Sequence, residues 1–243
     1  MIDFALKYQA VIFASLEEIS PSPDILKYFI EEFKDKGLIP SMFQEITANG
    51  KISNRFIFKS LNDEWEIEFG INRLNIKKVN RDIHVSNFGT KKEFLEEVVK
   101  IVNVIFNKFP HKANRISFVT QYFIKPTDSK GLNSIASKVS ILSKTYQDNP
   151  PINWNHRYVS RMEKKISEKN EIVNFIGEIN RVQGNLKINS KIEEFDRVEL
   201  KFDINTFQGN QEFRFSINDI EDFYEKVYEW EDILLNEFLK IME

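Results

Sequence analysis

Three charged residues late in the chain have types and spacing that suit nuclease chemistry. Asp196 is followed by Glu199 and Lys201 in the run DRVELK. In nucleases with an acid followed by Glu-x-Lys, the two carboxylates hold a divalent ion and the lysine steadies the attacked phosphate or water. Glu199 and Lys201 are two residues apart, so they share one face of a predicted strand. The run therefore supports a metal-dependent nuclease, although exposed strands also carry Glu and Lys for solubility.

The densest group of hydrogen-bonding side chains follows a rigid break, Asn-Pro-Pro, at residues 149–151. Such a break can present the residues after it in a loop. These include Trp154, His156 and Arg157. We expect this loop to recognise a protein partner. The alternative is that Trp154 only closes the structure by packing its ring.

Negative charge is concentrated in the last predicted helix. Residues 216–243 contain nine acidic and two basic side chains, which gives −7, whereas the whole chain carries −3. We expect Glu225, Glu229 and Asp232 on its acidic face to contact a basic protein partner, or a basic surface on another copy of the chain. The alternative is a solvated helix surface. The buried face is predicted by a helical spacing of apolar residues, namely Ile220, Phe223, Val227, Trp230, Ile233, Leu234, Phe238 and Ile241.

A nucleic-acid-binding saddle is a further alternative. Basic side chains with interleaved Phe and Tyr run through the predicted sheet, and such side chains bind phosphates and stack on bases. Residues 51–82 carry seven basic but also five acidic side chains, which is short of a strong phosphate stripe. The basic residues are Arg55, Lys59, Arg73, Lys77, Lys78, Arg81, Arg157, Arg161, Lys164, Lys165, Arg181 and Lys187.

Other catalytic patterns are absent from the sequence. There is no cysteine, which excludes thiol nucleophiles and thiolate metal sites and favours a reducing compartment, with the cytoplasm as the default. His84, His111 and His156 lie far apart and lack metal-ligand spacing. Eight glycines in 243 residues leave little material for a phosphate-binding loop. We therefore expect no catalytic residue, no metal and no cofactor.

The composition indicates a compact chain. A hydrophobic content of 42%, with 22 phenylalanines, is enough for a sizeable core. The first residues include Asp3 and Lys7 and lack the basic region and cleavage site of a signal peptide. No run reaches the roughly 18 apolar residues of a membrane span.

The predicted elements occur twice in the same order. Each half begins with a strand and a helix, continues with several strands and ends with a long helix, which is β-α-β(3–4)-α. We expect an α+β protein in which two duplicated units, residues 1–112 and 113–243, form twisted antiparallel sheets with helices packed on one side and fuse into one body. Apolar spacing places the helices at residues 22–36, 90–109, 132–146 and 216–243.

Two local signals refine these elements. Thr90-Lys-Lys-Glu93 has the residue types of a capping box at the start of a helix. The turn at residues 208–210, Gln-Gly-Asn, predicts a last strand over residues 212–217.

This order of elements resembles the TATA-binding-protein fold, in which two such units form one curved sheet. The runs NRFIF, EFLEEVVKIVNVIFNKF, NRISFVTQYFI and EKVYEWEDILLNEFLKI also resemble a sporadically distributed, functionally uncharacterised prokaryotic family of proteins of this length. The second resemblance implies a component of a bacterial multi-gene system, such as defence against phage. With no catalytic constellation, we expect a non-enzymatic protein-binding or scaffold module.

Overall fold

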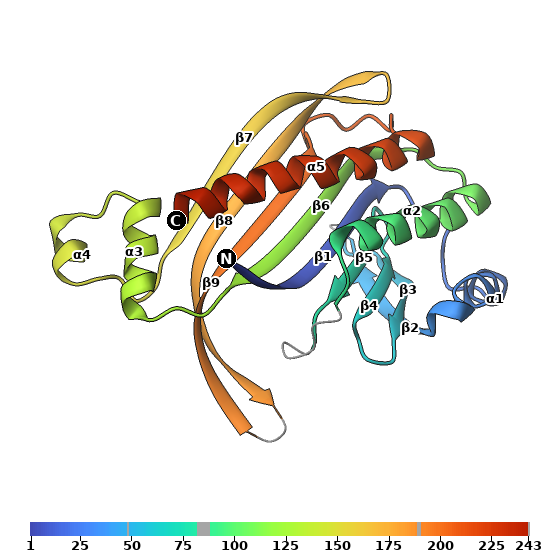
Figure 1. The fold of residues 1–243 in the computed structure, drawn as a ribbon. Helices are drawn as coiled ribbons and strands as arrows, with labels where there is room; N and C mark the ends of the chain where they lie inside the picture. The colour runs from blue at the N-terminus through green and yellow to red at the C-terminus, as the bar shows by residue number, and fades with distance from the viewer. Residues whose placement is uncertain (48, 82–87, 189–190, 243) are drawn as a thin grey trace.

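The computed structural model describes residues 1–47, 49–81, 88–188 and 191–242 (Figure 1). Its strands form one antiparallel sheet in the order β2-β3-β4-β5-β1-β6-β9-β8-β7. The prediction of an α+β protein is confirmed, with one sheet rather than several. The strands are β1 (Ile2–Ala14), β2 (Leu38–Ile46), β3 (Ile52–Ser60), β4 (Trp65–Phe69), β5 (Leu74–Val79), β6 (Ala113–Ile124), β7 (Asn155–Ile166), β8 (Lys169–Ile188) and β9 (Lys191–Thr206).

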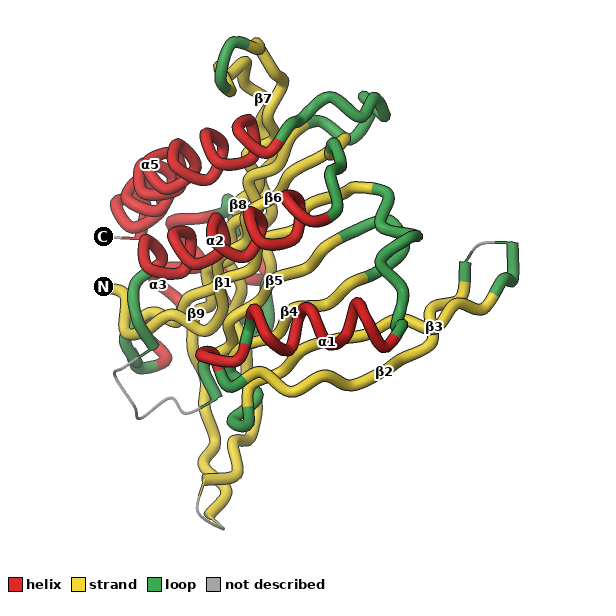
Figure 2. The backbone as a smooth tube through the Cα atoms, turned by 90° about the vertical axis from the view of Figure 1, so that its right-hand side faces the viewer, coloured by secondary structure: helices red, strands yellow, loops and turns green. Residues whose placement is uncertain are grey.

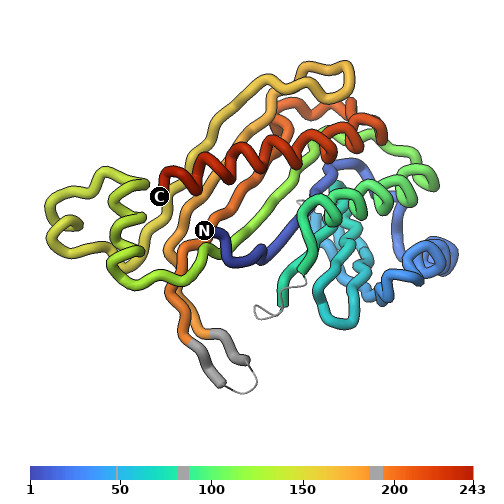
Figure 3. Tube along the Cα trace, viewed as in Figure 1, coloured from blue at the N-terminus to red at the C-terminus, as the bar shows by residue number. Residues whose placement is uncertain are grey.

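The centre of the sheet is the antiparallel pair of β1 and β6. Tyr8 pairs with Thr120 and Ile12 with Ile116, so, within the described residues, the five strands before residue 112 and the four after it form a continuous sheet. At its far side, β9 pairs with β6 only from Glu199 onward and with β8 over its whole length. The β8–β9 hairpin therefore projects beyond the neighbouring strands (Figure 3).

Helices α1, α2 and α5 lie over one face of the sheet (Figure 2). Phe29 of α1 packs against Phe69 at 4.8 Å between ring centroids, and Phe94 of α2 stacks on Phe118 at 6.3 Å. Phe238 of α5 meets Phe202 edge-on. In the described ranges, no helix combines the length and the apolar character that crossing a membrane requires. The helices are α1 (Pro23–Glu32), the 3-10 helix η1 (Lys34–Lys36), α2 (Lys91–Lys108), α3 (Ser129–Val139), α4 (Lys144–Asp148) and α5 (Ile217–Met242).

The capping box of α2 is confirmed. The Glu93 amide donates to Thr90 Oγ1 at 3.2 Å, and the Thr90 amide donates to Glu93 Oε2 at 2.7 Å. Both bonds satisfy amides that the first helical turn leaves without a partner. These bonds pull the pKa of the Glu93 carboxyl below its ordinary value, because they favour its charged form.

Two expected elements differ in the structure. The helix expected at residues 132–146 is split into α3 and α4, because Ser140 adopts an extended backbone and its hydroxyl donates to the Ala136 carbonyl. Residues 212–217 form no strand beyond a single bridge between Phe215 and Ala113. That segment is held by the Arg214 side chain, which forms a two-bond ion pair with Glu171.

The buried stripe of α5 is also shifted from the expected one. Ile233 and Ile241 are 60% and 49% exposed. Tyr224, Glu231 and Met242 are buried instead. The true stripe therefore includes a carboxylate, which a sequence pattern counts as polar.

Candidate functional site

A groove lies between the two long helices α2 and α5, which run side by side over the sheet (Figure 1). Its volume is about 700 Å³. Leu95 and Tyr224 are buried, and Val99 and Tyr228 are half-buried. These four side chains give the groove an apolar lining that includes two aromatic rings.

Charged side chains form the rim of this groove. On the α5 side, Glu225 and Glu229 are exposed and one helical turn apart. On the α2 side the charges alternate, with Lys92, Glu96 and Lys100. Neither Glu225 nor Glu229 has an ion-pair partner among the described residues. The α5 rim therefore carries two carboxylates that are free to meet a basic group.

The third acidic residue expected at this surface, Asp232, is used differently. Lys91 bonds to both Asp232 and Glu231, so Asp232 belongs to an internal ion pair between α2 and α5. The structure thus places Glu225 and Glu229 at one groove and directs Asp232 away from it. The reason is its ion pair, because the Asp232 carboxylate bonds to Lys91 of α2 and does not line the groove.

The loop predicted to recognise a partner is partly built into the fold. Trp154 is only 8% exposed, and its carbonyl accepts a hydrogen bond from the Arg181 amide. His156 is half-buried, with its ring 5.9 Å from that of Trp154. Arg157 is exposed but pairs with Glu178 on the adjacent strand at 3.1 Å. These contacts favour the alternative in which Trp154 closes the structure.

The three residues of the nuclease hypothesis do not converge. Asp196 and Glu199 are three positions apart on β9, so they point to opposite faces of the sheet. Both Asp196 oxygens accept from Arg181, at 2.9 and 2.7 Å, whereas Glu199 accepts from Gln121 and Asn180. Lys201 lies 3.7 Å from Glu178. In the ranges that the structure describes, no three His, Asp or Glu side chains are grouped as metal ligands, and His84 lies outside those ranges.

The basic residues of the saddle hypothesis are largely neutralised within the sheet. Lys59 and Lys77 both pair with Glu66, and Lys78 pairs with Glu64 at 3.0 Å. Burial opposes ionisation of Glu66, but the two lysines hold its pKa below the ordinary value. Arg55 is 1% exposed, so its guanidinium cannot reach a phosphate.

A buried polar cluster was not anticipated from the sequence. Glu231 is fully buried on α5 and bonds to Lys91 of α2. Its Oε1 also accepts from Thr120 Oγ1 at 2.8 Å and from the Tyr122 hydroxyl at 3.0 Å. Burial and the Glu231 charge raise the pKa of Tyr122. In the sequence, the feature that could have indicated this cluster is Glu231 itself, because it lies four residues after Val227 in an otherwise apolar stripe.

The Arg181–Asp196 pair predicts a loss of stability in acid. Its hydrogen bonds hold the pKa of Asp196 below the ordinary 3.8. Its stabilising effect is therefore complete above that value and is lost as pH falls through the lower folded-state pKa. Urea unfolding at about pH 6 should show Asp196→Asn to be less stable than the unmodified protein, and this gap should shrink at about pH 3. Asp35→Asn, at an exposed site, is the control, and an equal gap at both pH values would contradict the assignment.

The fold and the groove define an α+β protein with an extended antiparallel sheet, helices packed on one face and a groove with a charged rim between α2 and α5. No protein-family model, no curated protein and no solved structure matches this chain. A functional assignment therefore depends on the chemistry of the surface.

Proposed function

We propose that this protein is a non-enzymatic protein-binding or scaffold module whose partner docks in the α2–α5 groove. The observation that carries the proposal is the pair of exposed carboxylates, Glu225 and Glu229, beside an apolar lining. An apolar centre with a charged rim is the usual anatomy of a protein interface.

The occupant that fits this groove is an amphipathic helix of the partner. A channel between two helices accepts a third helix, whose apolar side chains repeat every three to four residues. Val99 and Tyr228 offer apolar surface to such a stripe. Lysine or arginine along the edge that faces α5 would meet Glu225 and Glu229, which fixes the orientation of the helix.

The wider assignments remain part of this proposal. The order of elements around the β1–β6 pair supports a duplication with a TATA-binding-protein-like arrangement, and superposing residues 1–112 on 113–243 should match the leading strands and closing helices. Membership of a bacterial defence system, and with it a cytoplasmic location, rests on the resemblance of sequence and on the lack of cysteine. Unrelated topologies in the two halves would contradict the duplication.

Reversing the acidic rim should weaken partner binding without unfolding the protein. Proteins captured from the native host should first be identified, and their predicted basic helices synthesised as peptides. Glu225→Lys with Glu229→Lys should weaken the best peptide at least about 10-fold at low salt, and less at high salt, because rim charges act through screened attraction. Calorimetric titration at low and at high salt measures the dissociation constant of the peptide for each protein.

The matched control is Glu31→Lys with Glu32→Lys, which makes the same charge change on the exposed end of α1. This control should bind as the unmodified protein does. If the two double variants weaken binding equally, the effect depends on the net charge of the protein and not on the position of Glu225 and Glu229. Unchanged binding by the α5 variant would remove the groove as the docking site.

The nuclease alternative predicts Mg²⁺-dependent cleavage, since Glu199 and Lys201 share one face of β9. The binding-module proposal predicts that the purified protein cleaves neither DNA nor RNA with Mg²⁺. Cleavage that Glu199→Gln and Lys201→Met abolish, at unchanged thermal stability, would contradict the binding-module proposal. Stability must accompany the assay because a destabilised variant loses activity for another reason.

A further inference from the structure

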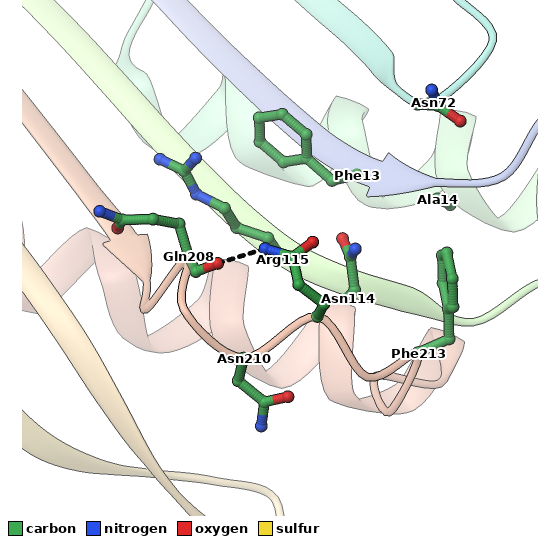
Figure 4. A pocket seen from close by; sticks show the side chains of 9 residues that line it. Phe13, Ala14, Asn72, Asn114, Arg115, Gln208, Asn210 and Phe213 are labelled. Carbon is green, nitrogen blue, oxygen red and sulfur yellow. Dashed lines mark hydrogen bonds between the residues drawn. The ribbon is translucent and has the colours of Figure 1, made fainter.

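A second cavity, of about 460 Å³, lies where the end of β1 and the start of β6 meet the segment between β9 and α5 (Figure 4). Phe13 belongs to β1 and Arg115 to β6, whereas Gln208 and Phe213 belong to the connecting segment. The cavity is distinct from the α2–α5 groove, with which it shares no lining residue.

Arg115 is unusual among the arginines of the chain. Every other arginine has a hydrogen bond or an ion pair within the protein. Within the described residues, Arg115 only stacks on Phe13, with its guanidinium carbon 4.8 Å from the ring centroid, and its Nε is buried without a hydrogen-bond partner. A cation in this state is available to an anion that enters the cavity.

The rest of the lining is neutral and rich in amides. Asn114 Oδ1 is buried and has no hydrogen-bond partner among the described atoms, and Asn72 and Gln208 add further amide groups. No carboxylate belongs to the described lining, so nothing there neutralises Arg115. The cavity therefore combines one positive charge with groups that can both donate and accept hydrogen bonds.

The wall formed by the connecting segment is held in place by Arg214. This side chain donates two bonds of 2.8 Å to Glu171 and a further bond of 2.6 Å to the Asn114 carbonyl. Its guanidinium also stacks on Phe215, at 4.2 Å. These contacts fix the backbone on both sides of the cavity, which is the preorganisation that a binding site requires.

We propose that this cavity binds a mononucleotide. The phosphate would pair with Arg115, since a guanidinium matches the geometry of phosphate oxygens. The base would use the amide groups, because Asn and Gln pair with base edges, and would stack on Phe213, which is 52% exposed at the mouth. A volume of about 460 Å³ lies within the usual range for small-molecule sites.

Calorimetric titration with AMP, GMP, CMP and UMP tests the proposal on the full chain. At least one nucleotide should bind with a dissociation constant below about 1 mM. Arg115→Gln should weaken it by about 10- to 100-fold, because a charge-assisted pair is lost. Lys112→Gln removes the same charge from an exposed position nearby and should leave binding unchanged.

Phe213→Ala is the second variant, because an exposed ring can be removed without disturbing the core. It should weaken the nucleotide by about 10-fold through lost stacking, at unchanged thermal stability. Adenosine and inorganic phosphate, titrated separately, should each bind much more weakly than the nucleotide. The proposal is overturned if no nucleotide binds, if phosphate alone binds equally well, or if Arg115→Gln and Lys112→Gln have the same effect.

Discussion

Replacing Lys91 with methionine should lower the free energy of unfolding by about 3 to 5 kcal/mol. Lys91 is 8% exposed and Glu231 is fully buried, so the substitution leaves a carboxylate in the interior without its cation. The bonds from Thr120 and Tyr122 do not supply the missing charge. Removing one partner of a buried ion pair is costly because the other keeps its desolvation penalty.

Urea unfolding of three variants measures this effect. Lys92→Met is the matched control, since Lys92 is the exposed neighbour on the same helical turn, and its change should stay within about 0.5 kcal/mol. Adding Glu231→Gln to Lys91→Met should restore at least half of the loss, because glutamine keeps an oxygen for Thr120 and Tyr122 but carries no charge. A Lys91→Met protein as stable as the control would show that Glu231 does not need its cation.

Replacing Arg55 with methionine should destabilise the protein by a similar amount, about 3 to 5 kcal/mol, because several buried acceptors lose their donors. Its Nη2 donates to the Leu16 and Gly70 carbonyls, both at 2.8 Å, and its Nε donates to the Phe69 carbonyl at 3.0 Å. Burial lowers the pKa of Arg55, which nevertheless stays charged near neutral pH. The Arg55 side chain therefore links the segment after β1 to the end of β4 through hydrogen bonds.

Thermal and urea unfolding should rank the stability of the Arg55 variants by the number of hydrogen-bond donors that each keeps at this position. Arg55→Lys should be intermediate, because an ammonium group lacks the planar fork that reaches several carbonyls at once. Arg73→Met is the control, since the Arg73 side chain is 54% exposed and lies 3.5 Å from Glu68. If Arg55→Met is no less stable than Arg73→Met, water satisfies the three carbonyls.

Local sequence determined α1, α2 and α5 and most of their ends, whereas α3 and α4 were expected as one helix. The α2 stripe and the Thr90–Glu93 box depend on residues within a few positions of one another, so their bonds form wherever that helix lies. The acidic Glu225 and Glu229 were found in the same way, because a helical period alone places them on one side of α5.

The tertiary structure decided which distant residues meet. Pairing of β1 with β6, and the return of the chain before α5, bring Phe13, Arg115 and Phe213 around one cavity. The burial of Arg55 and Glu231 depends on carbonyl, hydroxyl and ammonium groups from other elements. A one-dimensional pattern records the polarity of a side chain but not its partners, and those partners determine whether a charge can be buried.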